Sequence, residues 1–156
     1  IHEGTHGIQG LDLLGRKVVM QQGAGLESLA ARMTATIARA ERSGILGEHA
    51  QALASALARL RSATGAAWAG GEPAAALANA TPYLQAFGHV VLAWVWLDAA
   101  LAAERRLAEG AAADAQRGRL QACRYFFRYE LPRIDAWLGV VATRDDTCRT
   151  MDADWF

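Results

Sequence analysis

Apolar side chains recur every three or four residues along most of this chain, which is the spacing of amphipathic α-helices. Residues 26–42 carry Leu26, Leu29, Met33 and Ile37 at this spacing, and residues 47–68 repeat it with Leu53, Leu57, Leu60 and Thr64. Glycines follow both segments, as expected where helices end. A further helix is predicted over residues 7–22, before Gly23 and Gly25.

Two longer helices are predicted in the second half of the chain. Residues 82–109 contain the run Val90–Leu97, which is apolar on every side, so this helix should be buried on more than one face. A membrane span needs about 20 predominantly apolar residues. Because Gln85 and His89 precede the run and Asp98 follows it, no span is expected.

The helix predicted over residues 113–142 has the most regular stripe: Leu120, Cys123, Phe127, Leu131, Ile134, Leu138 and Val141. Pro132 lies within it and has no N–H to donate to a carbonyl one turn earlier. The stripe keeps its phase on both sides of the proline. We therefore expect a kink that preserves the buried face, and neither a straight helix nor a loop.

These elements define the fold class as all-α, an antiparallel bundle of four to five long helices. The expected domain organisation places the bundle at residues 24–143, a separate N-terminal piece at 1–23 and an irregular tail at 144–156. An Ala/Gly-rich stretch at 65–80 is the one low-complexity segment.

Asp98 is a candidate buried carboxylate. It follows the apolar run and continues a stripe through Leu84, Phe87, Val91, Trp94 and Leu101. A buried carboxylate without a partner is costly, so an arginine should meet it. Arg124 and Arg128, one helical turn apart, are the expected partners.

Composition excludes some classes of function. The 156 residues hold 16 Lys and Arg and 16 Asp and Glu, so no net field favours nucleic acid or an anionic membrane. Two cysteines, Cys123 and Cys148, are too few for a disulfide framework, and we expect structural thiols in a cytoplasmic protein. The start has no secretory-signal pattern and no methionine, which indicates a piece of a longer protein.

The first residues contain His2, Glu3 and His6, the H-E-x-x-H pattern of zinc peptidases. That site requires both histidines on one face of an established helix. Here Gly4 lies inside the pattern, and Asp12 and Gln9 stand where the longer zinc motif has histidine and glycine. We expect no metal site, and a zinc hydrolase is the weaker alternative.

The same residues also read as Glu3-Gly4-Thr5-x-Gly7-Ile8-Gln9, followed by Asp12-Leu13-x-Gly15-Arg16-Lys17. In this form the stretch resembles the acyl-CoA dehydrogenase family, whose catalytic chain ends with such a loop and one further helix. The continuation resembles that of larger bacterial members, which append another helical domain. Residues 1–20 carry the specific match, and the rest is compatible with the appended domain. By this resemblance, residues 1–23 are the end of the catalytic helical domain, with its active-site loop and last helix, and residues 24–143 are the appended domain.

The resemblance implies a chemistry for the loop. Family members remove an α-proton from an acyl-CoA thioester while a β-hydride passes to FAD. By the match, Glu3 is the base, Gly4 lies against the substrate, and Thr5, His6 and Gly7 approach the cofactor. A carboxylate with a pKa raised by burial suits a general base. His2 stands where the family has tyrosine, and His6 where a small polar residue is common.

The resemblance also implies partners and a physiological setting. For the parent enzyme these are an acyl-CoA substrate, an electron-transfer flavoprotein, a homo-oligomeric state and a role in fatty acid metabolism. The fragment alone lacks most of the flavin site, so it should be inactive, mainly structural and without bound FAD. A second hypothesis is an autonomous interaction or oligomerisation module, with Trp68, Tyr83, Trp137, Trp155 and Phe156 as candidate exposed anchors.

Overall fold

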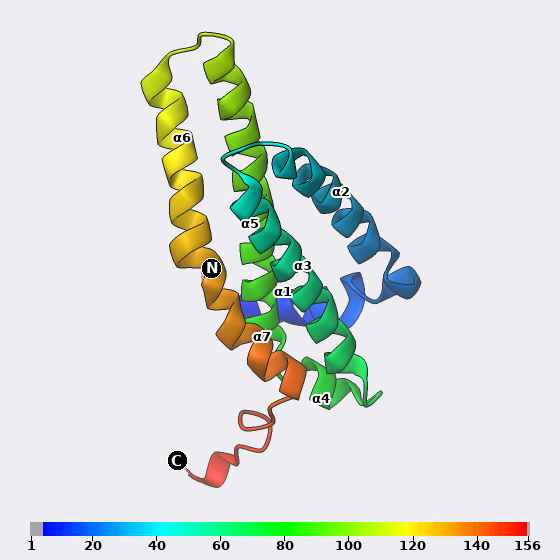
Figure 1. Ribbon diagram of the computed structural model, residues 1–156. Helices are drawn as coiled ribbons and strands as arrows, with labels where there is room; N and C mark the ends of the chain where they lie inside the picture. Colours follow the sequence, from blue (N-terminus) through cyan, green and yellow to red (C-terminus); the bar gives the residue numbers. More distant parts are fainter. Residues whose placement is uncertain (1–4, 156) are drawn as a thin grey trace.

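The computed structural model describes residues 5–155, and within them every regular element is helical. Helices α2 (Ala24–Glu41), α3 (Gly47–Trp68), α5 (Ala80–Ala108) and the rod that begins with α6 (Ala113–Tyr125) run alternately up and down (Figure 1). Short turns join consecutive helices, so neighbours are antiparallel. The predicted all-α antiparallel bundle is confirmed.

Helix α5 lies at the centre of the bundle, where it contacts α1 (His6–Asp12), α2, α3, α6 and α7 (Ile134–Thr143) (Figure 1). Its fully buried side chains include Tyr83, Val90 and Leu97, which meet Leu53 and Leu60 of α3 in one core. Of the helices among residues 5–155, α5 is the one long and apolar enough to cross a membrane. Its central place in the bundle accounts for the buried part of this apolar composition, whereas Leu92 and Val95 of the apolar run are about half exposed.

The last helix bends at Pro132 without losing its buried face. A π-helical turn (Phe126–Glu130) and a 3₁₀ turn (Leu131–Arg133) separate α6 from α7 (Ile134–Thr143). The N–H of Leu131 donates to the carbonyl of Phe126, five residues earlier, so the ladder widens just before the proline. Leu131, Ile134 and Leu138 stay buried, which confirms the predicted kink.

The helix predicted over residues 7–22 ends earlier in the structure, so its predicted C-terminal end is wrong. Helix α1 (His6–Asp12) continues as a π-helical turn (Leu13–Lys17), and the backbone then breaks. Gln21 and Gln22 have positive φ angles of 51° and 57°, and Gly23 caps α2 in the same left-handed region. Residues other than glycine rarely adopt this conformation, so the presence of Gln21 and Gln22 did not predict a break in the helix.

The Ala/Gly-rich stretch also contains a helix that the pattern did not predict. Helix α4 (Pro73–Leu77) has proline in its first turn, where the missing N–H is harmless. Ala76 is buried and Leu77 packs against the core. This short helix connects the end of α3 to the start of α5 (Figure 1).

The prediction for Asp98 is wrong in both burial and partner. Its side chain is 55 % exposed and pairs with Arg39 of α2, not with Arg124 or Arg128. The buried positions of α5 lie one residue before the assumed stripe, at Tyr83, Ala86, Val90, Ala93, Leu97 and Ala100. In a helix apolar on every side, sequence does not fix which face is innermost.

Candidate functional site

The residues predicted to do chemistry lie at the start of the described chain. Glu3 and Gly4 fall outside the described residues. Thr5 precedes α1 as its N-cap residue, and the Thr5 carbonyl accepts a hydrogen bond from the N–H of Gln9 at 2.8 Å. Thr5, His6 and Gly7 are all exposed. The structure therefore places the three predicted cofactor-binding residues together at the beginning of one short helix.

Helix α1 is held against the bundle by a close backbone contact. A Cβ atom on Gly10 would lie 2.7 Å from the carbonyl oxygen of Ala80, so only glycine allows this approach. In the turn that follows, the carbonyl of Leu14 accepts a hydrogen bond from the indole N–H of Trp68 at 3.2 Å. Leu14 itself is fully buried. These contacts hold α1 and the turn after it against the bundle.

The continuation of the motif forms an ion-pair cluster on the solvent side of this segment. Arg16 donates from Nε to the Asp12 carboxylate at 2.6 Å, and the Lys17 ammonium lies 3.6 Å from the same carboxylate. The hydrogen bond from Arg16 lowers the pKa of Asp12, and Lys17 adds to the effect. The conspicuous charges of the motif thus stabilise its helix and do not reach toward Thr5.

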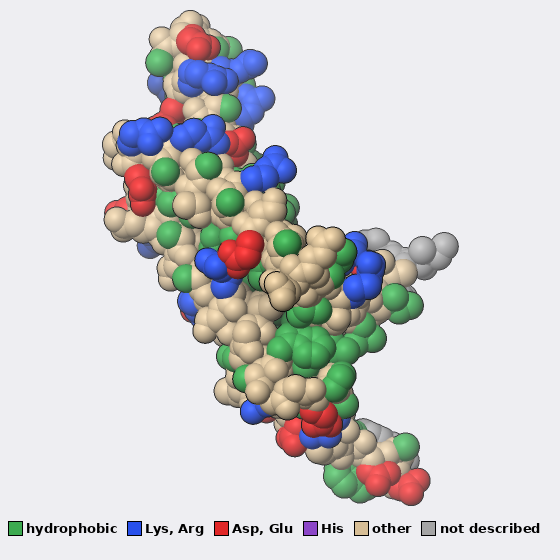
Figure 2. Space-filling view, turned by 90° about the vertical axis from the view of Figure 1, so that its right-hand side faces the viewer, with side chains coloured by type: hydrophobic (Ala, Val, Ile, Leu, Met, Phe, Trp, Pro, Cys, Tyr) green, Lys and Arg blue, Asp and Glu red, His purple; other side chains and the backbone are tan. Residues whose placement is uncertain are grey.

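Much of the surface around α1 is apolar. Ile8, Leu11, Val19 and Met20 are between 37 % and 66 % exposed. Figure 2 shows one side of the molecule, on which Lys and Arg side chains lie mostly in the upper half and hydrophobic side chains gather lower down. The predicted site therefore adjoins exposed apolar side chains.

His6 belongs to no group of metal-binding side chains within the described residues. Among residues 5–155, no three His, Cys, Asp or Glu side chains come close enough together to hold a metal ion. The other two members of the H-E-x-x-H pattern, His2 and Glu3, lie outside the described residues.

The candidate anchors of an interaction module are mostly part of the core. Tyr83 is fully buried, with its hydroxyl 2.7 Å from Thr64 Oγ1. Trp68 and Trp137 are partly buried and pack against the core. Trp155 is 69 % exposed, and Phe156 lies outside the described residues. Tyr83, Trp68 and Trp137 are thus explained by folding, contrary to the anchor hypothesis.

Sequence comparison defines the class of protein that carries this bundle. The family described as acetyl-CoA dehydrogenase C-terminal like matches residues 29–152. The chain belongs to the acyl-CoA dehydrogenase family, as the resemblance of its first twenty residues predicted.

A particular relative is similar along nearly the whole chain. The 3-methylmercaptopropionyl-CoA dehydrogenase of Ruegeria pomeroyi is 34 % identical over an alignment of 156 positions, which covers 96 % of this chain. The matched region is 26 % of that relative, so this chain spans about a quarter of its length, at the C-terminal end.

Proposed function

We propose that this chain is the C-terminal portion of a flavin-dependent acyl-CoA dehydrogenase and that it contributes the catalytic loop, with Glu3 as the α-proton base. One observation carries the proposal: the Glu3-Gly4-Thr5 loop leads directly into α1, and α1 is fixed to a bundle of the dehydrogenase family. Gly10, which makes the contact between α1 and the bundle, stands five positions after Thr5 in the sequence.

The proposed reaction removes two hydrogens from the acyl group, the α-hydrogen as a proton and the β-hydrogen as a hydride. The Glu3 carboxylate accepts the α-proton of the thioester and becomes a neutral acid, while the two electrons of that C–H bond form the new carbon–carbon double bond. FAD, which Thr5, His6 and Gly7 would help to hold, would supply the acceptor for the hydride from the β-carbon. Gly4 has no Cβ, so the backbone next to Glu3 can lie close to the thioester. The product is a trans-2-enoyl-CoA.

The residues that follow suit a phosphate-bearing cofactor. The first N–H groups of a helix have no partner within the helix and favour anions. Around Gly7 a Cβ atom would meet nothing within 4 Å, so the described chain leaves this end of α1 open to another group. Thr5, His6 and Gly7 would contact one side of FAD here, and the rest of the parent enzyme would supply the other contacts.

For the parent enzyme we propose an acyl-CoA substrate, an electron-transfer flavoprotein as electron acceptor, a homo-oligomeric state and a cytoplasmic location. The name of the Ruegeria relative specifies a short acyl group that contains a thioether. An acyl group of that size is a reasonable first substrate to test. The isolated chain is then mainly structural.

Substitution of Glu3 in the whole parent protein tests the proposal. Glu3→Gln removes the base but keeps a side chain of similar size, so FAD should stay bound while acyl-CoA fails to bleach its absorbance. Loss of a general base costs at least about 10²-fold in rate. Stopped-flow absorbance under anaerobic conditions measures this rate.

A matched control uses another glutamate. Glu41→Gln changes an exposed residue at the end of α2, far along the chain from the loop, and should leave flavin reduction unchanged. Equal rates in the Glu3 variant and the unmodified enzyme would remove Glu3 from the mechanism.

A further inference from the structure

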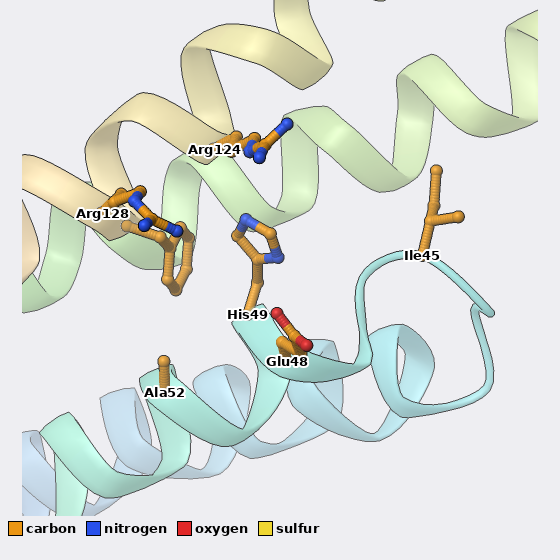
Figure 3. A pocket seen from close by; sticks show the side chains of 7 residues that line it. Ile45, Glu48, His49, Ala52, Arg124 and Arg128 are labelled. Atoms are coloured by element: carbon orange, nitrogen blue, oxygen red, sulfur yellow. The ribbon is translucent and has the colours of Figure 1, made fainter.

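A cavity of about 430 Å³ lies on a part of the bundle that the proposed catalytic loop does not use. It opens between the first turns of α3 and the junction of α6 with the π-helical turn (Figure 3). Its lining residues are Ile45, Glu48, His49, Ala52, Arg124, Phe127 and Arg128. Two arginines and a histidine thus face one hollow.

The two arginines lack the partners that their neighbours have. In the rod from α6 to Arg133, Arg117 pairs with Asp114, Arg119 donates to Gln116 and Arg133 pairs with Glu130. Among residues 5–155, nothing forms a hydrogen bond or ion pair with Arg124 or Arg128. Within this rod, the two arginines without a partner are therefore the two that line the cavity, and both are exposed at its edge.

His49 adds a polar group with no partner in the fold. Its Nδ1 atom is buried, and no described residue forms a hydrogen bond with it. Its ring packs edge-on against Phe127, with the centroids 4.8 Å apart, and is directed toward the helix that carries Arg124 and Arg128 (Figure 3). Nδ1 has no accessible surface, so a molecule in the cavity would meet the other ring nitrogen, Nε2, which lies on the side of the ring nearer the arginines (Figure 3).

Burial favours the neutral form of the His49 ring. Burial lowers the pKa of His49, Glu48 opposes this shift, and Arg124 adds to it. A neutral imidazole has one donor and one acceptor nitrogen and can therefore bond to an anion without a charge of its own. The Glu48 carboxylate is the one negative charge in the lining, opposite two guanidinium cations.

We propose that this cavity binds an organic phosphate monoester. The phosphate would lie between Arg124 and Arg128, and its apolar part would lie against Ile45, Ala52 and Phe127. A phosphate group carries close to two negative charges at neutral pH, and its three terminal oxygens can accept bonds from two guanidinium groups and an imidazole together. A carboxylate offers only two oxygens. The proposal does not depend on the catalytic role of Glu3.

Phenyl phosphate is the probe, titrated into the full 156-residue chain while the imidazole NMR signals of His49 are followed. Saturable shifts are expected with a Kd below about 10 mM. Arg124→Gln and Arg128→Gln should each weaken binding about 10-fold, because each removes a charge-assisted hydrogen bond. Glu48→Gln should strengthen it by removing the opposing charge.

Arg117→Gln is the matched control, since it changes an exposed arginine of the same helix outside the cavity. It should bind phenyl phosphate like the unmodified chain. Phenol and benzoate should bind at least about 10-fold more weakly than phenyl phosphate if the phosphate is the recognised group. Inorganic phosphate should also bind more weakly, because it lacks the apolar part.

Three results would overturn the proposal: no saturable shift of the His49 signals, equal loss of binding in the Arg117 and Arg128 variants, or benzoate binding as tightly as phenyl phosphate. Inorganic phosphate binding as tightly as the ester would refute the apolar subsite, and with it an organic ligand.

Discussion

Tyr83 is the largest side chain that the bundle buries completely. The Thr64 hydroxyl donates to the Leu60 carbonyl at 2.8 Å, so the Tyr83 hydroxyl can donate its own proton to Thr64 Oγ1. Burial raises the pKa of Tyr83 to about 12. The buried phenol is therefore held in its neutral form.

This shift predicts a loss of stability in alkali. In the unfolded chain Tyr83 ionises near its ordinary pKa of 10, whereas in the folded chain it stays neutral up to about 12. Ionisation then favours the unfolded state, and the free energy of unfolding should fall by about 1.4 kcal/mol per pH unit between these values. Urea denaturation at pH 9 and pH 11 measures the fall.

Tyr83→Phe should remove this part of the pH dependence and cost about 1 kcal/mol at neutral pH, through the lost hydrogen bond. Tyr125→Phe, which changes an exposed phenol, should keep the full alkaline fall. The interpretation fails if the Tyr83 and Tyr125 variants lose the same stability between the two pH values.

At the residue scale, the sequence marked the loop residues as candidates but did not mark the cavity. Glu3, Thr5 and Gly7 belong to a short motif with fixed spacing, so a resemblance identified them. Arg124 and Arg128 were noticed only as partners for Asp98, and His49 was missed. The cavity joins residues about 75 positions apart, a contact that only the packing of α3 against the last helix creates.

At the element scale, the contact between α1 and α5 depends on Gly10. Gly10→Ala would place a Cβ atom 2.7 Å from the Ala80 carbonyl oxygen, which is backbone and cannot rotate away. Overpacking of this kind costs about 1–3 kcal/mol. We expect α1 to move off the bundle, with faster amide hydrogen exchange over residues 6–17 and little change in α3.

Gly7→Ala is the control within the same helix, because its Cβ atom would meet nothing within 4 Å. It should leave hydrogen exchange unchanged or slow it, since alanine favours helix by up to about 1 kcal/mol over glycine. Similar exchange rates in the two variants would show that the close contact with Ala80 does not hold α1.

The bend at Pro132 belongs to the same scale. Pro132→Ala restores one N–H, but the side chains around it pack against a bent helix, with Phe127 and Leu131 both buried. We expect the far-ultraviolet circular dichroism to be unchanged and the free energy of unfolding to change by no more than about 1.5 kcal/mol. A large loss of helix content would show that the proline itself maintains the fold.

Sequence predicted most helices because their ends are marked. Helix α3 begins at Gly47 and ends at Trp68, the bounds that periodicity and the following glycines predicted. The break at Gln21 and Gln22 has no such mark, since both residues favour helix and are left-handed here. Helix α4 did have a signal, Pro73 at its first position, which the surrounding alanines and glycines obscured.

At the scale of the whole molecule, this chain contributes residues to only one side of the proposed flavin site. Thr5, His6 and Gly7 lie exposed at the start of α1. The isolated 156-residue chain should therefore be colourless after purification, and added FAD should show no saturable binding by fluorescence titration below about 100 µM. Tight binding of FAD by this chain would mean that the cofactor contacts have been assigned to the wrong part of the parent.

Some properties of the whole molecule could be predicted from the sequence, and others could not. The all-α class could be predicted because helical period, alanine content and scarce proline agree. The innermost face of α5 could not, since Val90–Leu97 is apolar throughout and only the neighbouring helices decide which positions are covered. The prediction that Asp98 is buried failed for this reason. In the structure its side chain lies on the exposed side of α5, where it pairs with Arg39.

The central claim, that Glu3 removes the α-proton of an acyl-CoA, is tested most directly by proton exchange at the α-carbon. The full-length parent is incubated in D₂O with a saturated acyl-CoA and no electron acceptor, and mass spectrometry follows deuterium at that carbon. We predict exchange by the unmodified enzyme and by Glu41→Gln, with at least about 10²-fold slower exchange by Glu3→Gln. Exchange at the unmodified rate in the Glu3 variant would contradict the account.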